Sequence, residues 1–251
     1  MNPTEPELIY ENADLVVVSK PAGMPVHEAK HSTDYSLCDW LLEKFPEIAS
    51  VGDVSPRGEL AEPYRPGIVH RLDKRTSGVM VVARTQDAFE NLKRLFKERA
   101  IEKTYLALIV GVPKKKSGVI DAPIGRLRAN PTKRGILRQA QDKSALRGSR
   151  QATTEYRRLE RLGEFSLLAV KPRTGRMHQI RVHLASIGTP VAGDKVYGGG
   201  RTKPHGLPRQ FLHAWKLAFS YPVGRRWQFE ASLPPDLKEV LAGLRRLRKA
   251  G

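Results

Sequence analysis

Residues 66–84 read PGIVHRLDKRTSGVMVVAR, a basic stretch with two glycines that leads into an apolar run. Its one carboxylate is Asp73, with Arg71 two residues before it and Lys74 and Arg75 directly after it. Nearby positive charge keeps an acid ionised at neutral pH. An ionised carboxylate can act as a nucleophile or a base, and it can equally form a salt bridge that only pins the loop. We expect any chemistry of the chain to lie here, and the local residues leave both roles open.

The first half of the chain predicts strands and helices around this stretch. The predicted apolar strands are LVVVSK (15–20), VMVVAR (79–84) and KTYLALIVG (103–111). Amphipathic patterns predict helices over 36–45 and 86–99, with Thr85 placed to cap the second helix. The segment 46–66 is rich in proline, glycine and charge, which predicts a long loop that leads to Asp73.

The second half begins with the compositional outlier, residues 113–151, which hold many Lys and Arg and few large apolar residues. Strands are expected at its ends and a flexible basic loop near 128–150. TTEYRRLERL and FSLLAVKPR then predict a hairpin joined at Gly163. After Gly175 a helix is expected, on which Arg181 lies three residues from His178 and projects from a neighbouring face.

Two further strands (211–220 and 226–233) and a C-terminal helix complete the expected elements. Seven or eight strands with four helices, without regular alternation, predict an α+β fold on a mixed, largely antiparallel sheet. The absence of alternation argues against a Rossmann or barrel fold, and the sequence contains no Walker or dinucleotide glycine motif.

The charge of the chain indicates a polyanionic partner. Lys and Arg total 44 against 26 for Asp and Glu, which gives a formal net charge of +18 over 251 residues. Such an excess favours nucleic acid first and an anionic membrane surface second, with a solvated basic surface as the alternative. The sequence shows neither a signal peptide nor an apolar run of membrane-spanning length. We therefore expect a cytoplasmic protein without a membrane partner.

Several side chains are candidates for a site with Asp73. Arg181 is its most plausible partner, because a buried acid needs a cation and arginine offers bidentate geometry. Tyr105 lies in an apolar strand, where it either packs in the core or presents its ring to a base. Cys38 is expected to pack rather than to react, and the histidines His70, His178 and His183 to form structural hydrogen bonds. No Cys/His cluster has the spacing of zinc ligands, so no metal is expected.

Three segments together resemble one known family. HRLDKRTSG (70–78), EKTYLALIVG (102–111) and TGRMHQIRVHLASIGTPVAGDKVYG (174–198) are similar, in order and spacing, to the signature segments of the RluA-like pseudouridine synthases. The N-terminal ADLVVVSKPAGMPVH (13–27) is also similar to that family. The resemblance extends from about residue 8 to 233 and implies the family's bent, mixed sheet. It also implies isomerisation of uridine in ribosomal or transfer RNA, without cofactor or metal.

Carried over residue by residue, the resemblance implies that Asp73 is the catalytic carboxylate and Tyr105 the tyrosine that packs on the target uracil. It implies that Arg181, or less certainly Arg176 of the same motif, pairs with Asp73. Arg71 would fill the gap left by a flipped base, and His70 and His178 are candidates for RNA contact. Asp73 could attack the base or the sugar, stabilise an oxocarbenium-like sugar, or abstract a ribose proton. The sequence does not choose among these routes.

The chain starts only a few residues before the catalytic motifs, whereas many family members begin with a separate RNA-binding domain. We therefore expect one catalytic domain over 1–251, monomeric, that captures RNA with its own basic surface. The residues expected to contact phosphates are Lys114, Lys115, Lys116, Arg126, Arg128, Lys133, Arg134 and Arg138. The alternative function is a non-catalytic RNA-binding or ribosome-assembly protein on the same scaffold.

Overall fold

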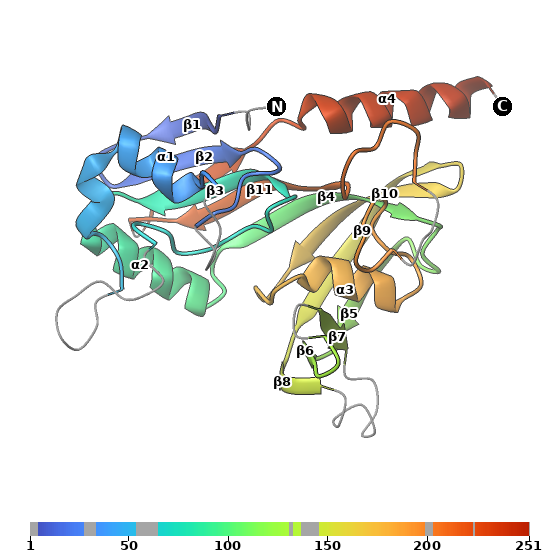
Figure 1. Ribbon diagram of the computed structural model, residues 1–251, viewed down its shortest axis with the longest axis horizontal. Coiled ribbons are helices and arrows are strands. Elements are labelled where there is room, and N and C mark those ends of the chain that lie inside the picture. Colours follow the sequence, from blue (N-terminus) through green and yellow to red (C-terminus); the bar gives the residue numbers. More distant parts are fainter. Residues whose placement is uncertain are drawn as a thin grey trace. The chain divides into compact units, whose positions relative to one another are not determined.

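The computed structural model describes residues 5–27, 34–53, 65–130, 133–136, 146–198, 203–222 and 224–250. The chain divides into two compact units (Figure 1). Unit 1 comprises Met1–Glu102 and Ala214–Ser232, and unit 2 comprises Lys103–His213 and Leu233–Gly251. The expectation that the chain works as one catalytic domain stays a prediction.

Unit 1 is built on a sheet with the strand order β1-β2-β3-β11, and β12 pairs with β11. Its strands are β1 (Glu7–Glu11), β2 (Leu15–Lys20), β3 (Ser77–Ala83), β11 (Leu212–Ser220, all but its first two residues) and β12 (Arg226–Glu230). Its helices are α1 (Leu37–Lys44), the short 3-10 helix η1 (Pro46–Ser50) and α2 (Gln86–Lys97). Every residue of β3 is buried, which explains its unbroken run of small and apolar residues.

The two long helices of unit 1 begin where the sequence predicts. Ser36 caps α1 in a reciprocal capping box, because the Asp39 carboxylate accepts the Ser36 N–H at 2.7 Å. Thr85 caps α2 by accepting the Ala88 N–H at 3.3 Å. The buried residues Phe89 and Leu92 then attach α2 to the core of the unit.

Unit 2 places one helix on each face of a sheet with the order β4-β10-β9-β5 (Figure 1). Its strands are β4 (Glu102–Val110, all but its first residue), β5 (Ser117–Asp121), β9 (Thr153–Leu162) and β10 (Phe165–Pro172), and its helices are α3 (Gln179–Ser186) and α4 (Pro235–Ala250). Leu184 of α3 packs with Ala107 and Ile109 on one face, whereas Leu237 of α4 packs with Leu108 on the other. Successive side chains of β4 therefore pack into two separate apolar clusters, one on each face of the sheet.

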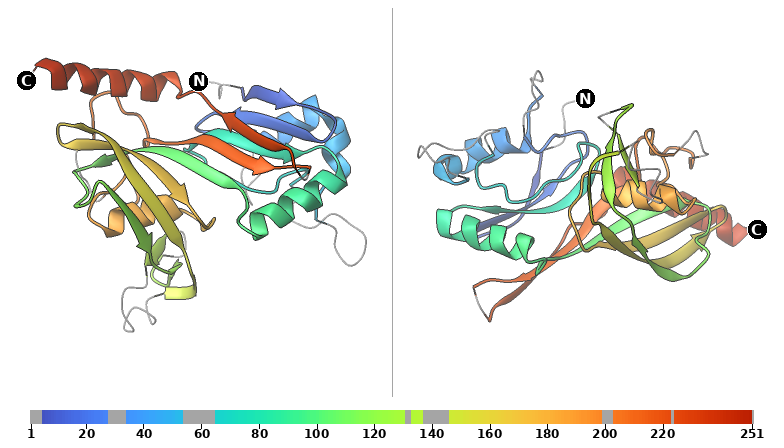
Figure 2. Two further views of the ribbon diagram at one scale, coloured as in Figure 1. Left: turned by 180° about the vertical axis from the view of Figure 1, so that it is seen from behind. Right: turned by 90° about the horizontal axis from the view of Figure 1, so that it is seen from below.

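The predicted hairpin is the long, curved pair β9–β10 (Figure 2). Gly163 forms its turn with φ of 61°, a left-handed conformation that favours glycine. All eight strand pairings with a described register are antiparallel. The predicted α+β class and largely antiparallel sheet are thus confirmed.

The expected loop near 128–150 is only partly a loop. A second, three-stranded sheet lies there, with the order β7-β6-β8. Its strands are β6 (Ile124–Leu127), β7 (Arg134–Ile136) and β8 (Leu146–Arg150). The described residues hold twelve strands, above the seven or eight expected. β5 and β8 lie near the two ends of 113–151, where strands are expected, whereas β6 and β7 are additional. Arginine and glycine make up at least half of β6 and β7, so these two strands lack the apolar pattern that signals a strand.

Candidate active site

Asp73 lies at the tip of a loop in unit 1 whose backbone is tied down on both sides. Before the tip, the Gly67 carbonyl accepts the Ala83 N–H of β3 at 2.9 Å. Gly67 has φ of 66°, and a Cβ there would lie 2.3 Å from the Ala83 carbonyl oxygen, so only glycine fits. At the tip, the Asp73 carbonyl accepts the Thr76 N–H at 2.9 Å. Main-chain hydrogen bonds therefore fix the position of the backbone from which the Asp73 side chain projects.

A buried lysine supports the other side of this tip. Lys20, at the end of β2, is fully buried, and its Nζ donates at 2.7 Å to the carbonyls of Pro21 and Met24. The same Nζ lies 3.4 Å from the carbonyl of Lys74, which also accepts the Gly23 N–H at 2.8 Å. A buried ammonium is costly unless it is hydrogen-bonded. Lys20 meets this condition by joining two loops directly beside the candidate carboxylate.

The other polar residues of the loop have distinct surroundings. Arg71 is exposed. The His70 Nε2 accepts the Val81 N–H at 3.1 Å, and its ring stacks on Phe96 with centroids 4.6 Å apart. His70 thus contacts both β3 and α2, which agrees with the structural hydrogen bond expected from the sequence. Its role in RNA contact stays a prediction. Lys74 points its amine to Asp34 at 2.8 Å, in an exposed ion pair.

Tyr105 lies half-buried in β4 of unit 2, opposite Val170 of β10. It packs against the same apolar cluster that contains Ile180 of α3. Tyr105 and the helix that carries Arg181 are therefore attached to one face of the unit 2 sheet. Lys103, two residues earlier in β4, has its pKa lowered by burial. Lys103 is not among the predicted site residues, although the alternation of a strand places it on the side of Tyr105.

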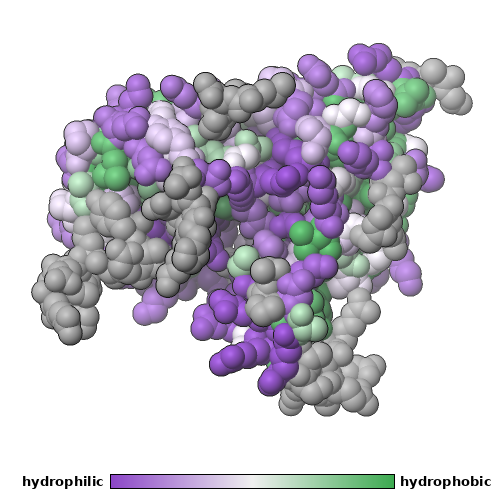
Figure 3. All heavy atoms as spheres, viewed as in Figure 1, coloured by the Kyte–Doolittle hydropathy of each residue, from purple (hydrophilic) through white to green (hydrophobic). Residues whose placement is uncertain are grey.

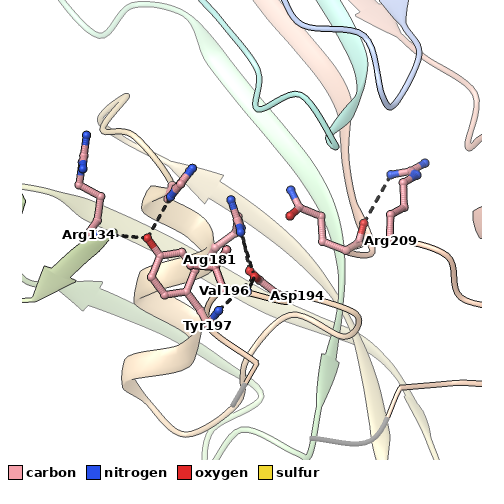
Figure 4. Close-up of polar contacts among 8 residues, drawn as sticks. Arg134, Arg181, Asp194, Val196, Tyr197 and Arg209 are labelled. Atoms are coloured by element: carbon pink, nitrogen blue, oxygen red, sulfur yellow. Dashed lines mark hydrogen bonds and ion pairs between the residues drawn. The ribbon is translucent and has the colours of Figure 1, made fainter. Parts of the chain in front are cut away.

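Arg181 forms a buried, bidentate salt bridge with Asp194 (Figure 4). Its Nε lies 2.7 Å from Oδ2 and its Nη2 2.9 Å from Oδ1. Oδ1 also accepts the N–H groups of Val196 and Tyr197, at 2.8 and 3.1 Å. Burial opposes ionisation of Asp194, but the hydrogen bonds and charge of Arg181 and these two N–H groups hold the pKa of its carboxyl below the ordinary value. The pair is therefore ionised at neutral pH.

Asp194 is the partner of Arg181 that sequence reasoning missed. It stands inside the quoted segment 174–198, directly after Gly193. Gly193 has φ of 73°, and a Cβ would lie 2.3 Å from the Arg209 carbonyl oxygen, so the turn that presents Asp194 requires glycine. A glycine-aspartate turn thirteen residues after a helical arginine was the available signal. The pairing of Arg181 with Asp73, which belongs to unit 1, stays a prediction.

Tyr197 joins the two motif residues that the sequence placed on neighbouring helix faces. Its ring centroid lies 5.1 Å from the Arg181 Cζ, and its hydroxyl lies 2.9 Å from the His178 Nδ1. The same hydroxyl accepts the Arg134 N–H at 2.9 Å (Figure 4). His178 was expected on the helix, but it directly precedes α3 and has a left-handed φ of 56°. Arg176, the less favoured partner for Asp73, directs its Nε to the Gln151 carbonyl at 3.3 Å.

The basic residues expected to contact RNA form two separate groups in unit 2. Lys114, Lys115 and Lys116 are exposed and precede β5, whereas the arginines lie on the small sheet that follows it. β5 stands between the two groups in the chain. The basic side chains of the small sheet and its turn are Arg126, Arg128, Lys133, Arg134 and the two not foreseen, Arg147 and Arg150. Figure 3 shows hydrophilic residues gathered over β6–β8. Arg138 lies outside the described residues.

Within the described residues, no group of three or more His, Cys, Asp or Glu side chains could hold a metal ion. No described helix is long and apolar enough to cross a membrane.

Comparison with known proteins bears directly on this site. A family model described as RNA pseudouridylate synthase matches residues 14–186, a range that contains Asp73, Tyr105 and Arg181 but ends before Asp194. An uncharacterized RNA pseudouridine synthase of Chloroflexus aurantiacus is 45% identical over 90% of this chain and 65% of that protein. The ribosomal large subunit pseudouridine synthase D of Nitrosomonas europaea is 39% identical over 96% of this chain and 66% of its own length. The chain thus spans about two thirds of the length of these relatives.

A solved structure supports the fold as well as the family. The structure titled Human RNA Pseudouridylate Synthase Domain Containing 4 is similar with a TM-score of 0.70 and 26% identity. The similarity covers 95% of this chain and 93% of the human one. By sequence and by structure, this chain belongs to the RNA pseudouridylate synthase family.

Proposed function

We propose that this chain is an RNA pseudouridine synthase, an isomerase that converts uridine in RNA to pseudouridine without a cofactor. The observation that carries the proposal is the family match across 14–186, which contains all three candidate catalytic residues. Relatives named for the ribosomal large subunit favour ribosomal RNA as the substrate, with transfer RNA as the second choice. We also propose that it acts as a cytoplasmic monomer.

The reaction defines what the site must do. The bond between N1 of uracil and C1′ of ribose breaks, the base turns and a bond forms between C5 and C1′. The C5 hydrogen leaves as a proton and N1 takes up a proton, so the product is an isomer of uridine. An ionised Asp73 would serve as the nucleophile, the stabiliser of a cationic sugar or the base that removes a ribose proton. Each role needs a carboxylate in a fixed position, and the Gly67, Thr76 and Lys20 contacts support that position.

The target uridine must leave the base stack before Asp73 can reach it, because stacking and pairing hide both its faces and its sugar. We propose that Tyr105 packs on the flipped uracil and that the exposed Arg71 fills the gap in the RNA helix. Tyr105 is suited to this role because its half-buried ring is supported by the apolar cluster beneath it.

Arg181 would stabilise the ionised carboxylate and the charge that develops during the reaction. The Asp194 carboxylate holds the guanidinium through Nε and Nη2. We propose that Arg181 also pairs with the Asp73 carboxylate. Asp194 would then be the residue that keeps the guanidinium oriented while the substrate enters.

RNA capture would rest on the two basic groups of unit 2. The exposed Lys114–Lys116 and the basic residues of β6–β8 together supply the positive charge for phosphate contacts. Each phosphate contact releases condensed counterions, so affinity should fall steeply with salt. Because a whole strand, β5, separates the two groups along the chain, we expect them to contact different parts of the RNA.

Tritium release tests the proposed function. RNA transcribed with 5-tritiated uridine should lose tritium to water when incubated with the wild-type protein, because isomerisation frees the hydrogen at C5. Mapping the modified uridines in ribosomal RNA would then identify the substrate position. Absence of release from both bulk ribosomal RNA and bulk transfer RNA would overturn the proposal and favour a protein that only binds RNA.

A further inference from the structure

Tyr197 touches three parts of unit 2 that the proposed function uses separately. Its hydroxyl binds the backbone of β7, its ring lies against Arg181, and its N–H donates to Asp194. We propose that Tyr197 is a positioning residue that fixes the basic sheet β6–β8 relative to Arg181. The proposal rests on the proposed function, since it assigns RNA contact to that sheet and catalysis to Arg181.

The hydroxyl is the link to the basic sheet. It accepts the Arg134 N–H of β7 at 2.9 Å, so its own proton is available for the His178 Nδ1, also 2.9 Å away. The Arg134 side chain adds a second contact to the same region, from Nη2 to the Met177 Sδ at 2.8 Å. One edge of the small sheet is therefore bound to the residues that directly precede α3, the helix of Arg181.

The ring and backbone of Tyr197 are the link to the salt bridge. The ring centroid lies 5.1 Å from the Arg181 Cζ, within the range of a cation–π contact. The Tyr197 N–H donates to the same Asp194 oxygen that accepts Arg181 Nη2. These contacts do not involve the hydroxyl, so the two links can be removed one at a time.

This separation makes the proposal testable with two substitutions. Tyr197→Phe removes the link to β7 and keeps the ring beneath Arg181. We expect the KM for RNA to rise about fivefold, the equivalent of one lost hydrogen bond, with kcat changed less than about twofold. Tyr197→Leu removes the ring as well, so we expect kcat to fall about tenfold in addition. Both are measured by steady-state tritium release, with thermal melting to verify folding.

Tyr156→Phe is the matched control. Tyr156 is a half-buried tyrosine of β9 in the same unit, and no hydrogen bond of its hydroxyl is found among the described residues. Its loss should leave KM and kcat at the wild-type values. A Tyr197→Phe enzyme that folds and has the KM of the control would overturn the coupling, even if Tyr197→Leu does not fold. A wild-type protein without activity would instead overturn the proposed function, and this inference with it.

Discussion

The Asp73 loop of unit 1 and the Arg181 network of unit 2 hold their functional side chains in different ways. The Asp73 loop is fixed through main-chain hydrogen bonds and one buried ammonium that bonds three carbonyls. Arg181 is fixed through side chains, by a buried carboxylate and an aromatic ring. Backbone support tolerates many side chains but demands glycine at close approaches. Side-chain support depends on particular partners, so single substitutions should affect it most.

The largest effect is expected where the side-chain support is a buried charge. Asp194→Asn leaves the buried Arg181 guanidinium without its carboxylate, which should cost about 3–5 kcal/mol of the free energy of unfolding. Where the variant still folds, its kcat should also fall, because the Arg181 guanidinium is no longer held in its orientation. Urea unfolding and tritium release measure the two effects.

Asp121→Asn serves as the control for this substitution, since Asp121 is an exposed carboxylate of unit 2 that also accepts side-chain hydrogen bonds. Its effect should stay within about 0.5 kcal/mol. Equal losses for the two variants would show that the burial of the Arg181–Asp194 pair is unimportant.

A smaller loss of the free energy of unfolding is expected when the support of the Asp73 loop is weakened. Lys20→Met keeps the length and apolar stem of the side chain but removes the donor of three carbonyl bonds. Hydrogen bonds to charged groups contribute about 1.5–3 kcal/mol each. Part of this loss is offset because the methionine variant no longer has the desolvation cost of a buried ammonium. We expect a net loss of about 2 kcal/mol by urea unfolding and lower activity. Lys97→Met, at an exposed lysine of α2 in the same unit, should change neither quantity, and an unaffected Lys20→Met would refute the supporting role.

The smallest effect is expected on the stability of the fold at acidic pH. His183 is fully buried in α3, between Thr154 at 2.8 Å and the Ala122 carbonyl at 3.1 Å. Burial lowers the pKa of His183 below 6.5. The unfolded chain therefore binds a proton below about pH 6.5 that the folded chain does not, and stability should fall on acidification by up to about 1.4 kcal/mol per pH unit.

His183→Gln should reduce this slope between pH 6.5 and 5, whatever its effect at neutral pH. Some slope should remain, because burial, together with Arg65 and Arg71, also lowers the pKa of His27 in unit 1. Urea unfolding at several pH values measures the slope. An identical slope in the variant would show that His183 does not contribute.

The same contrast explains what the sequence could reveal. The strand at 15–20, the Thr85 cap and the turn at Gly163 follow from local patterns, and the structure confirms them. Strands β6 and β7 of the small sheet were missed because they carry arginine and glycine in place of alternating apolar residues.

A residue of the candidate site could be predicted where its neighbours in the sequence make it unusual. Asp73 was prominent as one acid among cations, whereas Asp194 and Tyr197 stand in an ordinary polar segment. Their importance depends on tertiary contacts with Arg181 and Arg134, which no local pattern encodes. The deeper reason is that side-chain support is non-local, while the glycines that allow backbone support are visible in the sequence.

The central claim is that Asp73 carries out the reaction, and tritium release from 5-tritiated uridine in RNA tests it most directly. Asp73→Asn should fold normally, bind RNA and lose more than about 1,000-fold of the release rate. Asp34→Asn, which removes the exposed ion pair with Lys74, should keep the wild-type rate. A wild-type rate in Asp73→Asn would contradict the account.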